Sequence, residues 1–258
     1  MPEAFYESRG EGCFSSTKNT AGPWSPHSQH FGPPAALLTR ALEAFPGGDD
    51  KLLARISIEI LGPVPIADLR VSADVVRPGK SVELLTASLR TEDKTVATAS
   101  AWRLARSDTS SVRAGAAPAM PPVERGVEFG RPDGWSPGYI DAMEWVSISG
   151  SLAESGPATV WVRQRIPLVV GEEPTPLQRL MAVVDSASGI STWLDPIRWL
   201  FINTELTVHV QRAPVGEWIG LDANTVIGPE GVGTALSAVH DERGQIANSS
   251  QALLVRPR

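Results

Sequence analysis

The feature that most constrains the fold is a repeated order of elements, in which strands, a helix and further strands occur twice. Helical periodicity is clear in two segments only, residues 32–48 and 175–189. The first begins with two prolines and ends in Pro-Gly-Gly, and the second has Thr175 as a possible cap. Segments of alternating apolar residues, typical of strands, flank both helices. The order predicts an internally duplicated α+β unit.

The two halves align without gaps at an offset of about 149 residues, at which Pro65 meets Pro214. A segment rich in Ser, Ala, Pro and Gly separates them. We therefore expect an N-terminal unit over residues 1–106, a linker over 107–137 and a C-terminal unit over 138–258. The C-terminal unit is expected to carry the active site.

Charge and composition exclude several classes of protein. A net charge of −6 argues against nucleic-acid binding, which normally needs a basic surface. No apolar run approaches the roughly 18–20 residues of a membrane span, and the N-terminus lacks the pattern of a signal peptide. With Cys13 as the single cysteine, no internal disulfide and no cysteine zinc site can form. These observations predict a cytoplasmic protein.

Four polar residues stand where an apolar core would be expected. Asp185 lies on the flank of the second helix's apolar stripe, where a charged carboxylate is costly unless it is hydrogen-bonded. By strand alternation Gln251 shares a face with Leu253. Asn203 and Thr204 open the strand after the second helix. Ordinary alternatives are a helix end at the solvent edge for Asp185, a water-exposed edge for Gln251 and strand-start chemistry for the other two.

The first half lacks counterparts for these polar groups, although a purely structural need for them would recur in both halves. At the offset of about 149 the opposite positions are Ala36 for Asp185, Ala54 for Asn203, and Trp102 (or, with a one-residue slip, Ala101) for Gln251. Because only the second half carries these polar residues, we expect a single site whose residues come mostly from the second half.

Four stretches resemble the actinobacterial thioesterase-like proteins, relatives of the bacterial acyl-CoA thioesterase II family. They are GPWSPHSQHFGPPAALLTRALE, PLQRLMAVVDSASGIS, FINTELTVHVQRAPVGEWIGLDA and GVGTALSAVHDERGQIANSSQALLVRP. The resemblance covers nearly the whole chain. It implies an α+β double hotdog fold, with two tandem repeats that each wrap a long helix in an antiparallel sheet. It also implies a homo-oligomer, an acyl-CoA or other acyl thioester as substrate, a place in lipid metabolism, and no cofactor.

The resemblance also implies roles for the polar residues. In the thioesterases that the chain resembles, an Asp in the helix, a Thr or Ser early in the next strand and a Gln in the last strand hold a water. Carried over, these are Asp185, either Asn203 or Thr204, and Gln251. The aligned position holds Asn203, where better-known relatives carry a hydroxyl. Asp185 would be the general base, while Gln251 and Asn203 would position and polarise the water.

Two residues at the start of the first helix are expected to bind substrate. In the resemblance His30 and Gly32 lie where they could line the acyl pocket. The alternative for His30 is a solvated loop histidine. His27 and His30 have no acidic neighbour in the sequence, so no metal site is expected.

The resemblance favours an acyl-CoA thioesterase that hydrolyses a fatty or related acyl thioester. A hotdog hydratase or dehydratase acting on enoyl thioesters needs a paired Asp and His, and residues 185–191 contain no His. A non-catalytic protein that binds acyl-CoA or an acyl chain is the third alternative, kept open by Asn203.

Overall fold

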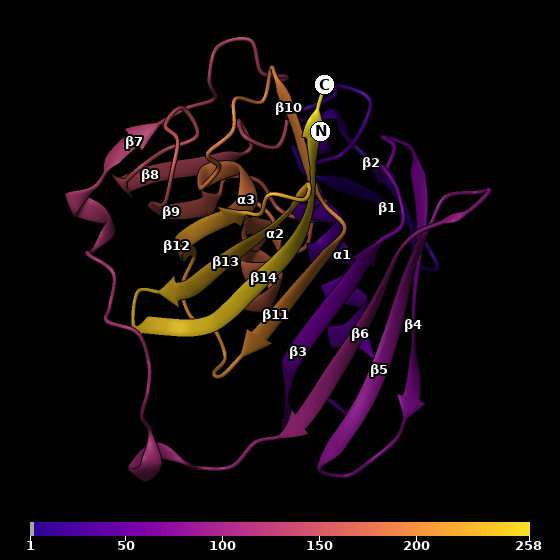
Figure 1. Cartoon of the computed structure of the whole chain (residues 1–258). Coiled ribbons are helices and arrows are strands. Elements are labelled where there is room, and N and C mark those ends of the chain that lie inside the picture. The colour runs from indigo at the N-terminus through magenta and orange to yellow at the C-terminus, as the bar shows by residue number, and fades with distance from the viewer. Residues whose placement is uncertain (1–2) are drawn as a thin grey trace.

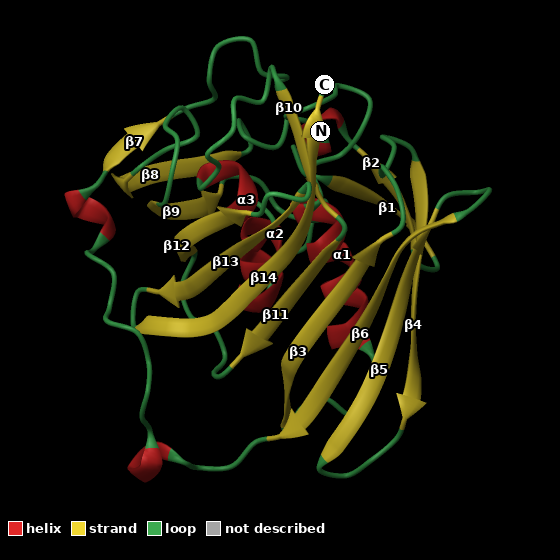
Figure 2. Ribbon diagram, viewed as in Figure 1, coloured by secondary structure: helices red, strands yellow, loops and turns green. Residues whose placement is uncertain are grey.

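Two helices lie side by side inside a curved antiparallel sheet (Figures 1 and 2). The structure is a computed structural model that describes residues 3–258. The helices are α1 (Gly32–Ala44), α2 (Pro176–Val184) and the short α3 (Ala187–Ile190). The strands are β1 (Tyr6–Gly10), β2 (Cys13–Ser16), β3 (Lys51–Ile60), β4 (Asp68–Arg77), β5 (Val82–Arg90), β6 (Thr95–Ala105), β7 (Val127–Phe129), β8 (Met143–Ser149), β9 (Ala158–Gln164), β10 (Trp199–Asn203), β11 (Glu205–Val210), β12 (Trp218–Ile227), β13 (Val232–Asp241) and β14 (Gly244–Pro257).

The first helix forms where the sequence predicts it. Pro33 and Pro34 occupy its first turn, where their missing N–H groups cost nothing. Its buried face includes Leu38 and Leu42, both without solvent exposure. The helix ends at Ala44, just before the Pro-Gly-Gly stop, because proline at position 46 disfavours the helical conformation in the residue before it.

The second helix is interrupted at Asp185, so the prediction of one helix over residues 175–189 is wrong. Thr175 and Gln178 form a capping box at its start. At its end, the Asp185 carbonyl accepts a hydrogen bond from the Gln251 side chain. The N–H of Gly189, which would bond that carbonyl in a continuous helix, donates to Ser186 instead. A long-range contact therefore ends the helix where the local pattern continues.

The sheet has 14 strands, and its order is nearly symmetric about the β3–β11 pair. The order is β1-β2-β4-β5-β6-β3-β11-β14-β13-β12-β9-β8-β7, with β10 paired to β14. At the centre, the Thr207 hydroxyl donates to the Ser57 hydroxyl at 3.1 Å, and the two residues are register partners. Each half contributes one long helix to the interior (Figure 1). The halves therefore share one strand order.

The strand registers correct the predicted offset by one residue. Thr86 pairs with Ser100 in the first half, and Leu236 pairs with Ser250 in the second. Equivalent residues in the two halves therefore differ in number by 150 rather than 149. Gln251 therefore corresponds to Ala101 rather than Trp102, and Asn203 corresponds to Leu53 rather than Ala54.

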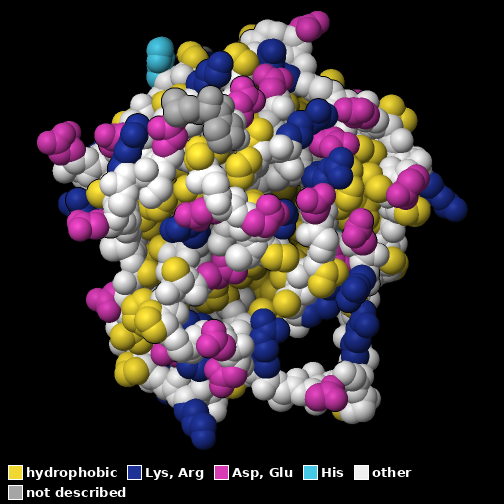
Figure 3. Space-filling model, turned by 180° about the vertical axis from the view of Figure 1, so that it is seen from behind, with side chains coloured by type: hydrophobic (Ala, Val, Ile, Leu, Met, Phe, Trp, Pro, Cys, Tyr) yellow, Lys and Arg dark blue, Asp and Glu magenta, His cyan; other side chains and the backbone are white. Residues whose placement is uncertain are grey.

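Residues 107–137 are only partly a free linker. Their first part stands away from the body of the molecule and encloses an opening (Figure 3). The later part lies on the sheet, where the Trp161 indole donates to the carbonyl of Pro121 at 2.8 Å. The segment also contains β7, which pairs with β8 at the sheet edge. Among the described residues, no helix is long and apolar enough to cross a membrane.

Candidate active site

A cavity of about 360 Å³ lies at the junction of α2 and α3 and contains Asp185 in its wall. The remaining walls come from the segment before α1, the end of β3 with the loop after it, the chain from the end of the linker through β8 to the loop after it, and β10. Asp185 is only 7% exposed. A carboxylate so far from water needs hydrogen-bond donors to stay charged.

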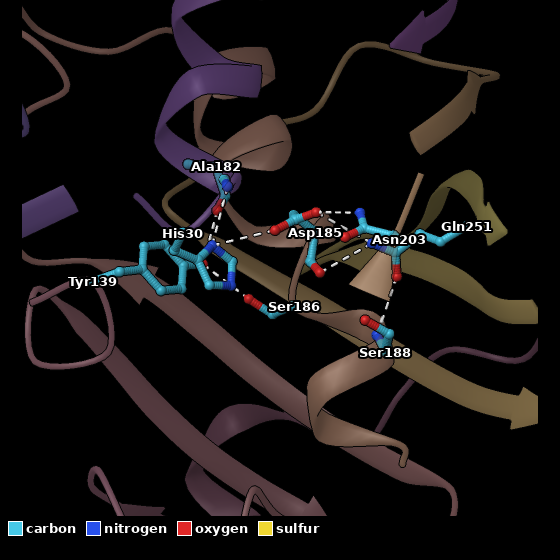
Figure 4. A network of polar contacts seen from close by, with 9 residues as sticks. His30, Tyr139, Ala182, Asp185, Ser186, Ser188, Asn203 and Gln251 are labelled. Carbon is cyan, nitrogen blue, oxygen red and sulfur yellow. Dashed lines mark hydrogen bonds and ion pairs between the residues drawn. The ribbon is translucent and has the colours of Figure 1, made fainter. Parts of the chain in front are cut away.

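One carboxylate oxygen of Asp185 accepts hydrogen bonds from two side-chain amides. Asn203 Nδ2 donates to Oδ1 at 2.8 Å, and Gln251 Nε2 donates to the same oxygen at 3.2 Å. The three side chains meet from the end of α2, the end of β10 and the middle of β14 (Figure 4). The structure thus brings together three residues that the sequence singled out.

Gln251 is fully engaged with the protein. It has no solvent exposure, and its Nε2 also donates to the Asp185 carbonyl at 3.1 Å. Its Oε1 accepts the Ser188 N–H at 3.1 Å. Because both amide hydrogens and the oxygen have protein partners, Gln251 orients Asp185 and the start of α3. A water, which the resemblance places against Gln251, could not accept a hydrogen bond from Gln251 unless one of its two N–H bonds broke.

A β-bulge lies between Asn203 and Thr204, the two residues that the sequence offered as the third member of the site. β10 pairs Asn203 with Leu253, and the register then shifts by one before β11 resumes pairing with β14. Thr204 occupies this break, and its hydroxyl is 3.4 Å from the carbonyl of Ala252. Both residues line the cavity, but only Asn203 bonds to Asp185. Asn203 uses one amide hydrogen there, so its second hydrogen and its oxygen remain for a ligand.

His30 contacts the other carboxylate oxygen. Its Nδ1 lies 3.3 Å from Asp185 Oδ2. The imidazole stacks on the Tyr139 ring, with centroids 3.7 Å apart and planes 7° apart. The His30 side chain is 12% exposed, so it is not a solvated loop residue. Its contact with Asp185 was not predicted, because the two residues lie far apart in the sequence.

Burial controls the protonation of His30. Removal from water lowers the pKa of His30, and the negative charge of Asp185 raises it by less. The Gly32 N–H donates to His30 Nδ1 at 3.0 Å, which requires a bare nitrogen there. His30 is therefore a neutral acceptor beside the carboxylate. Gly32 itself lies behind His30 rather than in the cavity wall.

Tyr139 joins His30 to the end of α2. Its hydroxyl donates to the Ala182 carbonyl at 2.8 Å and lies 3.0 Å from the Ser186 hydroxyl. Burial raises the pKa of Tyr139, so its hydroxyl stays protonated and can donate. The residue follows directly after the linker, and the sequence offered no signal for its role.

Within residues 3–258, no group of three or more His, Cys, Asp or Glu side chains is placed to hold a metal ion. The chemistry available is that of a carboxylate, a neutral imidazole and side-chain amides beside an apolar cavity.

Two family models match the sequence of this chain. Residues 121–255 match the family model "Acyl-CoA thioesterase C-terminal domain", and residues 20–104 match "Acyl-CoA thioesterase N-terminal domain". No curated protein matches the sequence.

Solved structures show the fold. A hot dog fold protein of unknown function from Alicyclobacillus acidocaldarius superposes with a TM-score of 0.77 at 17% identity, covering 97% of this chain and 95% of that chain. A candidate thioesterase II from Thermobifida fusca gives 0.74 at 18% identity, covering 96% and 95%. The acyl-CoA thioesterase II TesB2 from Mycobacterium marinum gives 0.66 at 13% identity, covering 98% and 95%. The predicted hotdog-type fold is confirmed.

Proposed function

Because the chain belongs to the acyl-CoA thioesterase family, we propose that it hydrolyses an acyl-CoA or a related acyl thioester with Asp185 as general base. The observation that carries this proposal is the buried Asp185 carboxylate in the wall of an apolar cavity, held by Asn203 and Gln251. A buried base of fixed orientation is what activation of a water requires.

We further propose that the fold is a tandem double hotdog. The nearly symmetric strand order, the constant offset of the registers and the two interior helices support this. The units would be residues 1–106 and 138–258, joined by residues 107–137. The carboxylate and the two amides would belong to the second unit, while the first would supply His30 and, from the segment before α1 and the end of β3, part of the cavity wall.

The reaction follows from the two oxygens of Asp185. Oδ1 is occupied by two amides, so Oδ2 is the oxygen that would take a proton from water. The water oxygen forms a bond to the thioester carbonyl carbon while its proton passes to Oδ2. The π electrons of the carbonyl move to its oxygen during this attack. They re-form the C=O bond as the C–S bond breaks, and the departing thiolate takes up a proton to become the free thiol.

His30 is placed to return that proton. As a neutral imidazole 3.3 Å from Oδ2, it leaves the carboxylate charged before the attack. After the attack, Asp185 can pass its new proton to His30 Nδ1, displacing the Gly32 hydrogen bond. His30 would then be the acid that protonates the leaving thiolate.

Release of free thiol from acyl-CoAs tests the proposal. Wild type should release thiol, and Asp185→Asn, which keeps the shape but not the charge, should lose at least about 100-fold in rate. Asp195→Asn is the control. Asp195 is exposed in the loop after α3 and does not line the cavity, so this variant should leave the rate unchanged. No release of thiol from any acyl-CoA by the folded wild type would reject acyl-CoA hydrolysis and leave acyl-thioester binding or enoyl-thioester hydration as the function.

The contact between His30 and Asp185 supports a second candidate, hydration of an enoyl thioester. That reaction needs a base for water and an acid for the α-carbon, and the absence of a His in residues 185–191 had counted against it. His30 supplies the missing partner from the first half of the chain. Loss of the conjugated enoyl absorbance without release of thiol would identify this activity.

A further inference from the structure

The walls of the cavity beside Asp185 are unusually aromatic. Phe, Trp and Tyr make up 6% of the chain, yet they provide six of the 25 residues that line this cavity. The six are Trp24, Phe31, Trp135, Tyr139, Trp145 and Phe201. Aromatic rings bind other rings through offset or edge contacts, in addition to the area that they bury.

Three of these rings form a cluster close to the catalytic carboxylate. Trp24 lies 5.1 Å from Trp135 and 5.3 Å from Phe201, between ring centroids. Phe201 is two residues before Asn203 in β10, so both side chains lie on one face, about 7 Å apart along the strand. A ring one or two carbons from the thioester carbonyl would therefore reach this cluster.

The charge of the lining restricts the acyl group further. Among the residues that line the cavity there is no Lys or Arg, and Asp185 is the single acidic side chain. An acyl group with its own carboxylate would lose hydration there without finding a cation. The same absence argues against the CoA diphosphate as occupant, and with it the adenine beyond the diphosphate. The cavity suits an uncharged acyl group.

The volume limits the size of that group. At about 360 Å³ the cavity lies near the lower end of the roughly 300–1,000 Å³ that small-molecule pockets span. A short acyl group that carries one aromatic ring fits.

From these observations we infer that the substrate of this site is a compact, uncharged, ring-bearing acyl thioester, whose ring lies against Trp24, Trp135 and Phe201. The inference deepens the proposed function and rests on it. Half-exposed Trp24 lies at the solvent side of the cluster and is the residue on which ring selection can be tested.

Binding and turnover are measured with a matched pair of ligands. The 3-phenylpropionyl and nonanoyl groups have equal numbers of non-hydrogen atoms, so only the ring distinguishes them. Their non-hydrolysable CoA thioethers give dissociation constants by calorimetry on the full-length protein, and their CoA esters give rates of thiol release. We expect about tenfold tighter binding and faster release for the ring compound.

Two tryptophan variants test the location. Trp24→Leu should reduce the ring preference to about threefold or less. The control is Trp193→Leu, because Trp193 is 54% exposed, lies outside the cavity lining and should leave the preference unchanged. Equal or tighter binding of the nonanoyl compound, or the same effect of both variants, would overturn the inference. Ring-selective binding with no thiol release from either ester would instead reject hydrolysis and retain the ring site.

Discussion

His30 Nδ1 and Asp185 Oδ2 lie 3.3 Å apart, although one residue precedes the first helix and the other follows the second. The close approach of α1 and α2 makes this contact, since Gly32 lies against the backbone carbonyl of Ala182. The candidate site thus takes its carboxylate from one half of the chain and its imidazole from the other. Four predictions follow from the contacts that hold this pair.

Gln251→Leu is expected to lower both stability and activity. The Ser188 N–H and the Asp185 carbonyl lose their buried partner, which costs about 1–3 kcal/mol for each group left unsatisfied. Urea unfolding should show this loss, and thiol release should fall because Asp185 is no longer oriented. Gln211→Leu, at an exposed position at the end of β11, is the control and should change neither quantity. Unchanged stability of Gln251→Leu would show that the bonds are not made.

His30 is expected to make stability depend on pH. The unfolded imidazole titrates near 6.5, whereas burial lowers the pKa of His30 in the folded state. Between these two values the unfolded chain binds more protons, so the free energy of unfolding rises with pH and levels off above about 6.5. Urea unfolding from pH 5 to 8 should therefore give a steeper slope for wild type than for His30→Asn.

The control for this experiment is His27→Asn, three residues earlier and exposed in the same loop. It should retain the slope of the wild type. Burial also lowers the pKa of His240, but that residue is present in every variant and cancels in the comparison. Equal slopes for wild type and His30→Asn would contradict the buried, neutral state of His30.

The sequence could predict those site residues that differ between the two halves of the duplication. Asp185, Asn203 and Gln251 stand out because their counterparts in the first half are apolar, and the structure places them in contact. Strand alternation likewise predicts the buried faces, as with Ile56 and Ile58 in β3. Both signals are local or periodic and so can be read along the chain.

The parts that sequence could not predict depend on contacts across the fold. His30 becomes a partner of Asp185 only through helix packing, and Tyr139 reaches the imidazole from beyond the linker. A helix end at Asp185 was one of the alternatives, but its cause could not be predicted, because Gln251, which bonds the helix carbonyl, lies 66 residues away. A pattern along the chain carries no information about such long-range partners.

Tyr139 is expected to act as a positioning residue for His30. Tyr139→Leu removes the ring that stacks on the imidazole, so His30 should lose its orientation, and kcat should fall by roughly tenfold or more. Tyr139→Phe keeps the ring and loses only the hydroxyl bonds to Ala182 and Ser186, so it should retain most of kcat. Rates of thiol release from pH 5 to 8 would separate positioning from general destabilisation. An equal loss in both variants would contradict the role of the stack.

Gly32→Ala is expected to separate the two helices. A Cβ at this position would lie 2.1 Å from the backbone carbonyl oxygen of Ala182, which cannot move aside as a flexible side chain could. Forcing an extra carbon into such a contact costs about 1–3 kcal/mol, and a shift of α1 would also draw His30 away from Asp185. Stability to urea and thiol release should therefore fall together. Gly189→Ala is the control, since a Cβ there meets no atom within 4 Å and alanine is the better helix former. Gly189→Ala should keep or raise stability, and an equally tolerant Gly32→Ala would show that the helices do not approach as closely as the contact requires.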